Sequence, residues 1–412
     1  MPTPSVRLPG SKSLTARALA IAAQADHPIR IVRPLVSDDT VAFREAIAAM
    51  GASVEVRGED WVVTGPVGRS GQQVDIWCAD AGTAARFLPP LAAVGKGTYT
   101  FDASEQLRRR PIRPLLEALR ELGATVRFHG PEHGFPFDIE GHGLSGGEVE
   151  VAGSQSSQFA SGLLMAGPSM DVGLTVRTPG LVSVPYVDMT IALMERCGVS
   201  VTRDDTDRFA VQPGRYSTDE IRIEPDASSA SYFLAAAVVT GTPITVEGLG
   251  WRSLQGDTRF ARVLQELGAD LDIADDSITV HGAAPPRGGT VDMGDISDTF
   301  MTLACVAPLA EEPIRIEGIG HARLKECDRI DAVARNLAAC GIRVETGSDW
   351  IQVWPGEARP ALIECMRDHR IAMSFSVLSL RYPGLRLDDP ACVSKTFPDF
   401  HDELAGVFGG RG

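Results

Sequence analysis

Side chains that bind anions and move protons occur in five short clusters along this chain. The clusters are SKSLTAR with Lys12 and Arg17, RRRPIRP from Arg108 to Arg113, KECDR with Lys325, Glu326, Asp328 and Arg329, DHR with Asp368, His369 and Arg370, and SKTFPDF with Lys395. Arginine forks and lysine ammonium groups bind carboxylates and phosphates, and neighbouring carboxylates can exchange protons. RRRPIRP alone is typical of a solvated face. The clusters beside apolar segments instead predict a site for small, multiply anionic substrates, because unpaired charges are costly there.

Lysine is rare in this chain, and the few lysines coincide with the clusters. Of 39 basic residues only four are lysines, at positions 12, 96, 325 and 395. A compact ammonium group that can lose its proton cannot be replaced by a planar, permanently charged guanidinium where a proton moves or space is tight. Lys12, Lys325 and Lys395 are therefore candidate site residues, whereas Lys96 belongs to no cluster.

Several other kinds of chemistry find no support in the sequence. There is no phosphate-binding loop of the GxxxxGK type, no HExxH pair and no nucleophile elbow. The GxGxxG match at 141–146 precedes a strand-like EVEVAG rather than a helix, so we interpret it as a turn. The seven cysteines form no CxxC pair, which argues against a disulfide framework and a zinc site. We expect neither metal nor cofactor.

Composition limits the partners and the location of the protein. The formal net charge of −15 disfavours nucleic acid and anionic membranes as partners. No apolar run approaches 18 residues, and MPTPSVRLPG lacks the apolar core of a signal peptide. We therefore expect a cytoplasmic enzyme with small-molecule substrates, no membrane or nucleic-acid partner and a monomeric state. Its 412 residues favour at least two domains.

An internal repeat organises the chain. An amphipathic helix that ends in glycine and leads into a short strand recurs with glycines at Gly51, Gly123, Gly198, Gly268 and Gly341, at spacings of 72, 75, 70 and 73 residues. Each glycine fits the position that follows a helix, where a left-handed backbone is needed. A second, more apolar helix recurs six times, in SKSLTARALAIAA, AGTAARFLPPLAAV, SSQFASGLLMAGP, SSASYFLAAAVV, SDTFMTLACVAPLA and AMSFSVLSL.

These patterns predict an α/β protein of two domains with three repeats each. The small polar residues that begin the apolar helices suit N-caps, and converging helix starts would form an anion site. Glu224-Pro225-Asp226 and Leu8-Pro9-Gly10 are plausible hinges. We expect an N-terminal domain at 9–225 and a C-terminal domain at 1–8 plus 226–412, with the first strand, VRL, in the C-terminal domain.

The motifs resemble those of the 5-enolpyruvylshikimate 3-phosphate synthase family, the 3-phosphoshikimate 1-carboxyvinyltransferases, from Leu8 to Leu404. The matching motifs, in the family's order, are PGSKSLTAR, AGTAAR, RRPI, SSQF, SVPYVD, DASSASYFLAAA, SDTFMT, KECDR, DHRIAM and SKTFPDF. The resemblance implies the two-domain inside-out α/β barrel of enolpyruvyl transferases, with the active site in the cleft between the domains. It also implies transfer of the enolpyruvyl group of phosphoenolpyruvate to the 5-hydroxyl of shikimate 3-phosphate, without metal or cofactor.

The resemblance further implies roles for particular residues. Asp298 is the expected base at the 5-hydroxyl. Glu326 and Lys12 are the candidates for transfer of the proton on C3 and for assistance to the departing phosphate. The expected phosphoenolpyruvate ligands are Lys12, Gly82, Arg110, Gln158, Arg329, Arg370 and Lys395. The expected shikimate 3-phosphate ligands are Ser13, Arg17, Ser156, Ser157, Gln158, Ser183, Tyr186, Asp298, His321 and Lys325.

Four positions depart from the family pattern. Asp80 and His321 stand where Asn is frequent, Phe87 where Pro is frequent, and Cys327 where Thr is usual. A carboxylate at Asp80 would repel a substrate phosphate unless it turns away or pairs with an arginine. These departures keep open a relative that acts on another phosphorylated hydroxyl compound such as a nucleotide. They also leave the response to glyphosate, the family's inhibitor at the phosphoenolpyruvate site, without a prediction.

Two further alternatives are distinguishable by sequence features. The sister family that uses UDP-N-acetylglucosamine typically opens with a KN pair and carries a Cys on a mobile loop. Here Ser13 follows Lys12, and the loop at 104–114 contains no Cys. A non-catalytic anion-binding relative would keep the cations but could lack Asp298 and Glu326, and both are present.

Replacing Lys12 or Lys395 by Arg should remove most of the activity although the positive charge remains. Arginine cannot release a proton under physiological conditions and needs more space than an ammonium group. The measurement is phosphate release from phosphoenolpyruvate with shikimate 3-phosphate, with Lys96→Arg as the control. Near-normal rates in both site variants would refute the argument from lysine scarcity.

Overall fold

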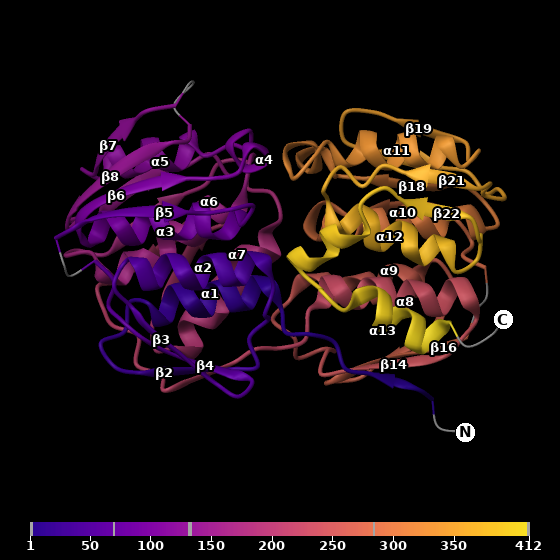
Figure 1. Ribbon diagram of the computed structural model, residues 1–412, viewed down its shortest axis with the longest axis horizontal. Coiled ribbons are helices and arrows are strands. Elements are labelled where there is room, and N and C mark those ends of the chain that lie inside the picture. The colour runs from indigo at the N-terminus through magenta and orange to yellow at the C-terminus, as the bar shows by residue number, and fades with distance from the viewer. Residues whose placement is uncertain (1–2, 69–70, 131–133, 283–284, 410–412) are drawn as a thin grey trace. The chain divides into compact units, whose positions relative to one another are not determined.

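A computed structural model describes residues 3–68, 71–130, 134–282 and 285–409, in two compact units. The N-terminal unit is Gly10–Ile223, and the C-terminal unit combines Met1–Pro9 with Glu224–Gly412. The chain therefore passes from one unit to the other twice, after Pro9 and after Ile223. Each unit is described by itself below, and Figure 1 shows the elements of both.

The N-terminal unit alternates helices with short strands. Its helices are α1 (Lys12–Ala22), α2 (Asp38–Ala49), α3 (Gly82–Val94), α4 (Glu105–Arg108), α5 (Arg113–Glu121), α6 (Ser157–Ala166) and α7 (Val184–Arg196). Its strands are β2 (Ile29–Val32), β3 (Ser53–Arg57), β4 (Asp60–Thr64), β5 (Gln73–Trp77), β6 (Lys96–Asp102), β7 (Thr125–Phe128), β8 (Phe137–His142), β9 (Gly147–Glu150), β10 (Leu174–Arg177), β11 (Val201–Asp205), β12 (Arg208–Val211) and β13 (Glu220–Arg222).

The described strands of this unit form three four-stranded sheets with one pairing pattern. The strand orders are β13-β2-β4-β3, β5-β6-β8-β7 and β11-β12-β10-β9. In each sheet one edge strand is parallel to its neighbour, and the other two pairings are antiparallel. Side chains alternate along β4, so Trp61 and Val63 are buried while their neighbours are half-buried. The sheets thus present one apolar face to the helices.

Helices α1, α3 and α6 are buried along most of their length, while α5 shows a polar face and an apolar face. Buried helices of this kind need an apolar surface on nearly every side, as the six apolar sequence segments predicted. Helix α3 packs against α1 and α6 and continues through Pro89 and Pro90. The starts of these helices carry several of the predicted site residues.

The C-terminal unit has the same alternation. Its helices are α8 (Ala227–Thr240), α9 (Arg259–Glu266), α10 (Phe300–Val306), α11 (Arg329–Ala339), α12 (His369–Ser379) and α13 (Phe400–Phe408). Its strands are β1 (Ser5–Val6), β14 (Ile244–Glu247), β15 (Asp270–Ile273), β16 (Ser277–Gly282), β17 (Gly289–Asp292), β18 (Ile314–Glu317), β19 (Val344–Thr346), β20 (Ile351–Val353), β21 (Ala361–Ile363) and β22 (Leu385–Leu387). Among the described residues the sheets are β1-β14-β16-β15, β17-β18-β20-β19 and a two-stranded β21-β22.

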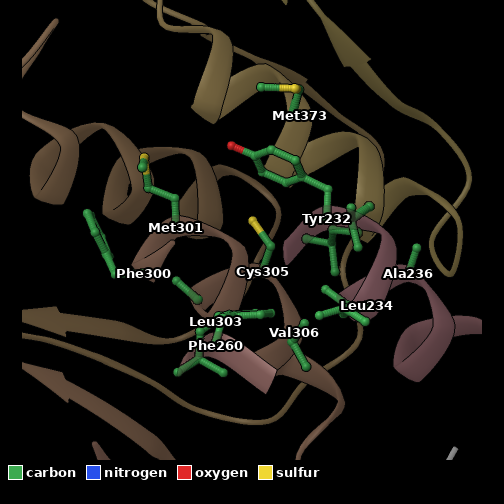
Figure 2. Packing of buried hydrophobic residues seen from close by; sticks show 14 of the residues in the cluster. Tyr232, Leu234, Ala236, Phe260, Phe300, Met301, Leu303, Cys305, Val306 and Met373 are labelled. Carbon is green, nitrogen blue, oxygen red and sulfur yellow. The ribbon is translucent and has the colours of Figure 1, made fainter. Parts of the chain in front are cut away.

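The core of the C-terminal unit lies among α8, α10 and α12, which pack against one another. Tyr232 on α8, Met301 and Cys305 on α10 and Met373 on α12 are buried there, as Figure 2 shows. Strand β1 runs parallel to β14 and forms an edge of that sheet. The first strand therefore lies in a sheet of the C-terminal unit.

Two local predictions from the sequence are confirmed. The five glycines that follow the amphipathic helices have positive φ angles, from +82° at Gly341 to +105° at Gly51. The GxGxxG match lies where β8 ends and β9 begins, so it is a turn and not the start of a helix. A helix N-terminus that could hold a dinucleotide does not follow it.

The capping prediction is only partly right. Ser11, Ser156, Asp226 and Asp368 cap α1, α6, α8 and α12 by accepting a backbone N–H. Helix α3 instead begins after Ala81, and α10 after Thr299, and neither has a side-chain cap bond. Helix α3 thus begins at Gly82 without a capping side chain, and the Arg110 guanidinium lies beside this glycine. Helix α12 also begins earlier than the apolar segment AMSFSVLSL suggested.

Candidate active site

The arginine of the KECDR cluster is the centre of a charge network in the C-terminal unit. Arg329, the first residue of α11, is 1% exposed. Its Nε donates to Asp368 Oδ2 at 2.7 Å, its Nη2 to Glu326 Oε2 at 2.7 Å, and its Nη1 to Asp298 Oδ1 at 2.9 Å. Burial lowers the pKa of Arg329, but these carboxylates outweigh burial and raise it above its usual value. The guanidinium is therefore permanently charged.

Asp298 bridges two arginines. Its second oxygen accepts from Arg370 Nη2 at 2.8 Å, so each oxygen pairs with a different guanidinium. Burial raises the pKa of Asp298, but Arg370, Lys325 and Arg329 outweigh it and hold the pKa well below the usual range. In this arrangement Asp298 is ionised and a weak proton acceptor.

Glu326 and Lys395 form a nearly buried ion pair beside the same network. Lys395 Nζ donates to Glu326 Oε1 at 3.2 Å, and the two side chains are 8% and 7% exposed. Glu326 thus lies between Lys395 and Arg329, with one oxygen toward each. Each oxygen of the Glu326 carboxylate thus has a cationic partner.

Asp368 fixes the geometry of the network. It is fully buried, caps α12 through the Arg370 backbone N–H at 2.9 Å, and accepts a second bond from Arg329 Nη2 at 3.3 Å. Cys327 Sγ donates to Asp368 Oδ2 at 3.7 Å, and burial raises the pKa of this thiol. Cysteine at this position therefore acts as a hydrogen-bond donor to Asp368.

His321 lies on the turn before α11 and is part of the same region. Its Nε2 and Ser297 Oγ lie 2.7 Å apart in a hydrogen bond. Burial, followed by the positive charge of Lys325, lowers the pKa of His321 to about 4. The imidazole is therefore neutral at pH 7 and offers polar contacts without adding charge.

Asp257, which the sequence analysis missed, adds a third carboxyl group near Asp298. It lies on the 3-10 turn Gly256–Thr258, is 5% exposed, and accepts a hydrogen bond from the Ser228 hydroxyl at the start of α8. Burial, followed by the negative charge of Asp298, raises the pKa of Asp257 to about 6. The two carboxyl groups thus have very different proton affinities.

In the N-terminal unit, Lys12 is the first residue of α1 and forms an ion pair with Asp39. The Nζ to Oδ2 distance is 3.1 Å, and the two side chains are 13% and 4% exposed. Asp39 belongs to the first turn of α2, so this pair joins the starts of two helices. Asp39 is a second residue that the sequence analysis missed.

Arg17 has a different environment from the one expected of a ligand. It is 1% exposed and donates Nε to Thr190 Oγ1 at 2.7 Å, Nη1 to the Ser13 carbonyl at 2.9 Å and Nη2 to the Tyr186 carbonyl at 2.9 Å. Burial lowers the pKa of Arg17 to about 10, so the group stays charged at neutral pH. Its guanidinium also lies 5.3 Å from the Phe87 ring, which gives this departure from the family pattern a packing role. Arg17 therefore positions its neighbours in α1 and α7.

Gly82 and Arg110 are in direct contact. A Cβ on Gly82 would lie 2.8 Å from Arg110 Nη1, so the guanidinium occupies the space that glycine leaves open at the start of α3. Asp80 accepts a hydrogen bond from the Ser104 hydroxyl, and Ser104 also caps α4. The hydroxyl group of Ser104 thus gives the Asp80 carboxylate a hydrogen-bond donor.

The remaining predicted residues lie at two helix starts. Ser156 caps α6 by accepting from the Gln158 backbone N–H at 3.2 Å, and Ser157 is 6% exposed. Gln158 Oε1 is buried, and no described residue donates to it. Ser183 precedes α7 with φ +55°, a left-handed conformation that is strained for a residue other than glycine, and Tyr186 follows in the first turn. Strain of this kind is often retained where a side chain must point at a ligand.

The predicted residues are thus divided between the two units. In the C-terminal unit, ion pairs connect Asp298, Glu326, Arg329, Arg370 and Lys395. In the N-terminal unit the predicted residues lie at the starts of α1, α3, α6 and α7 and on the segment before α5. The described residues contain no group of three or more His, Cys, Asp or Glu arranged to hold a metal ion, and no described helix is long and apolar enough to cross a membrane.

Comparison with known proteins identifies the family. Residues 3–404 match the family model described as EPSP synthase (3-phosphoshikimate 1-carboxyvinyltransferase). The 3-phosphoshikimate 1-carboxyvinyltransferase of Nostoc punctiforme is 39% identical over 402 residues, which cover 96% of this chain and 94% of the relative. The enzyme of that name from Burkholderia lata is 40% identical over 417 residues, which cover 98% and 96%. The chain belongs to the EPSP synthase family.

Solved structures agree in fold. An EPSP synthase from Acinetobacter baumannii superposes with a TM-score of 0.81 at 24% identity, covering 98% of this chain and 95% of that chain. The enolpyruvyl transferase NikO from Streptomyces tendae superposes with a TM-score of 0.78 at 20% identity, covering 98% and 94%. These likenesses confirm the two-domain α/β fold of enolpyruvyl transferases that the sequence predicted. As a member of the EPSP synthase family, the chain is a transferase.

Replacing Asp257 by Asn should stabilise this EPSP synthase family member at pH 8 but hardly at pH 4. Folding raises the pKa of Asp257 from 3.8 to about 6, so its contribution to stability is present below 3.8 and is lost as the pH rises through 6. Asn has no proton to lose. We expect the thermal midpoint of the variant to exceed that of the wild type by about 2–4 °C at pH 8.

The control for this measurement is Asp276→Asn, because Asp276 is exposed. If the thermal midpoint of Asp257→Asn rose as much at pH 4 as at pH 8, ionisation of Asp257 would not be the cause of the stabilisation.

Proposed function

We propose that this transferase moves the enolpyruvyl group of phosphoenolpyruvate to the 5-hydroxyl of shikimate 3-phosphate, as a cytoplasmic monomer whose two compact units act as its two domains. The products are 5-enolpyruvylshikimate 3-phosphate and inorganic phosphate. Family membership across residues 3–404 supports the reaction, and the charge network around Arg329 is the structural observation that carries it. That network combines anion-binding arginines with carboxyl groups that can exchange protons.

Phosphoenolpyruvate carries a planar carboxylate and a phosphate, and we assign them to different cations. Arg329 and Arg370 take the carboxylate, because together they already hold one carboxylate, that of Asp298, in the described structure. Lys12, Arg110, Gln158 and Lys395 take the phosphate. Gly82 permits the close approach of Arg110, and the partnerless Gln158 Oε1 suits a ligand hydroxyl.

We assign shikimate 3-phosphate to polar groups at helix starts and to the carboxyl-rich network. The proposed ligands are Ser13, Arg17, Ser156, Ser157, Gln158, Ser183, Tyr186, Asp298, His321 and Lys325. Backbone N–H groups at the starts of α1 and α6 add donors for the phosphate. Arg17 contributes mainly by holding the carbonyl groups of Ser13 and Tyr186.

The proposed reaction has two steps in which protons and bonds balance. In the addition, C3 of phosphoenolpyruvate gains a proton, the 5-hydroxyl oxygen bonds to C2, and Asp298 accepts the hydroxyl proton. In the elimination, C3 loses a proton and the C2–O bond to phosphate breaks, which restores the double bond. Glu326 and Lys12 are the candidates for the proton on C3, and Lys395 keeps Glu326 in place.

The acceptor test decides this function. Phosphate release from phosphoenolpyruvate is measured with shikimate 3-phosphate, UDP-N-acetylglucosamine or UMP as acceptor. We expect turnover only with shikimate 3-phosphate, because the matched family uses that acceptor. Absence of turnover with it would contradict the proposal, and turnover with UMP alone would favour a nucleotide-specific relative.

Replacing Gly82 by Ala should raise the KM for phosphoenolpyruvate about tenfold, the equivalent of ~1.4 kcal/mol in binding. The new methyl group meets the end of the Arg110 side chain at 2.8 Å, so the guanidinium must move. Because that end is flexible, we expect an unchanged thermal midpoint. Gly406→Ala is the matched control, since nothing lies within 4 Å of its added Cβ. An unchanged KM in Gly82→Ala would refute the role of Arg110.

A further inference from the structure

We propose that Asp298 competes with the carboxylate of phosphoenolpyruvate for Arg329 and Arg370, so that binding of this substrate releases the base. The inference rests on the proposed function, which assigns the two arginines to phosphoenolpyruvate and Asp298 to the hydroxyl proton. It adds a sequence of events to that function: phosphoenolpyruvate binds first, and only then is Asp298 available as the base.

The geometry of Asp298 is that of a bound carboxylate ligand. Oδ1 accepts from Arg329 Nη1 at 2.9 Å and Oδ2 accepts from Arg370 Nη2 at 2.8 Å. Both distances are typical of charge-assisted hydrogen bonds. A substrate carboxylate that bridges the two guanidinium groups in the same place competes with Asp298 for these donors.

Arg329 has little capacity for a further carboxylate. A guanidinium has five N–H groups, and four of those of Arg329 donate to Asp368, Glu326 and Asp298. The side chain is 1% exposed, so it cannot swing out to meet a ligand. An incoming carboxylate can form paired bonds with Arg329 only by replacing one of the three carboxylates already present.

Asp298 is the carboxylate that can leave at the lowest cost. Asp368 is fully buried and also caps α12, and Glu326 is 7% exposed and also paired with Lys395. Asp298 is 18% exposed, the most of the three, and it accepts hydrogen bonds from the two arginines. Displacement of Asp298 therefore breaks no helix cap and no second ion pair.

Release changes the ability of Asp298 to accept a proton. The charged and titratable groups that act on it are Arg370 on α12, Arg329 and Glu326 at the start of α11, Lys325 and His321 on the preceding turn, and Asp257 on the turn after β14. In the bridged arrangement the cations hold the pKa of Asp298 well below its usual range. Loss of the two guanidinium contacts weakens the attraction of Arg370 and Arg329, and the attraction of Lys325 remains.

The test is a binding measurement on variants. Isothermal titration calorimetry with phosphoenolpyruvate, at pH 8 and without shikimate 3-phosphate, compares the wild type with Asp298→Asn. If the substrate must displace Asp298, the neutral amide gives way more easily, and the Kd should fall at least tenfold. A variant that had merely lost a base would bind phosphoenolpyruvate as the wild type does.

Asp257→Asn is the matched control, because it also removes a buried negative charge near Asp298 and Arg370. Asp257 accepts a hydrogen bond from the Ser228 hydroxyl and is not one of the carboxylates that bridge Arg329 and Arg370 in the contacts described above. We expect its Kd to fall less than threefold. The proposal is overturned if the Kd for phosphoenolpyruvate falls less than tenfold in Asp298→Asn. It is also overturned if the Kd falls equally in Asp257→Asn.

A structure of the wild-type protein with phosphoenolpyruvate gives a test that needs no variant. Asp298 must then lie away from both guanidinium groups, and an unbroken bridge overturns the proposal even if Asp298→Asn does not fold. The acceptor assay on the same wild-type preparation separates this inference from the function. If the wild type is active but Asp298→Asn does not bind phosphoenolpyruvate more tightly, only the release of Asp298 is refuted. If the wild type shows no turnover, the proposed function is refuted.

Discussion

The structure of the C-terminal unit depends on one constraint, that a permanently charged guanidinium is almost completely buried at Arg329. A buried charge is tolerated only if partners compensate it and satisfy its hydrogen bonds. The three compensating carboxylates precede three different helices, at Asp298 before α10, Glu326 before α11 and Asp368 at the cap of α12. The starts of these helices must therefore meet at Arg329. The apolar packing of α8, α10 and α12 brings them there, and the charges determine their alignment.

The N-terminal unit also buries a guanidinium, that of Arg17, but surrounds it with neutral groups. Arg17 is as buried as Arg329, but its guanidinium is satisfied by two carbonyl groups and a threonine hydroxyl rather than by carboxylates. Its charge is therefore available to attract anions through the protein, although its N–H groups are occupied. Carboxylates thus compensate the buried arginine of the C-terminal unit, whereas carbonyl and hydroxyl oxygens surround that of the N-terminal unit.

Much of this arrangement was predictable from the sequence, for identifiable reasons. The left-handed glycines, the apolar helices and the turn at 141–146 follow from local backbone and side-chain physics, and all were predicted. The family motifs pointed to Arg329, Glu326 and Lys395, whose proximity the structure now gives. Asp257 and Asp39 were missed because each is an ordinary acidic residue near a helix start in sequence. Their importance comes from burial beside distant charges, and no local pattern encodes that. The motif that contains Arg17 likewise does not reveal which oxygens surround its guanidinium.

The pairing of β1 with β14 has a consequence for how the chain is made. The first strand leaves the ribosome long before its partner, which lies more than 200 residues later in the sequence. The N-terminal unit, as one uninterrupted stretch, can fold during synthesis, while the segment ahead of it waits unpaired. The C-terminal unit can therefore be completed only after the whole N-terminal unit has been made, because its first sheet needs β1 from before that unit and β14 from after it.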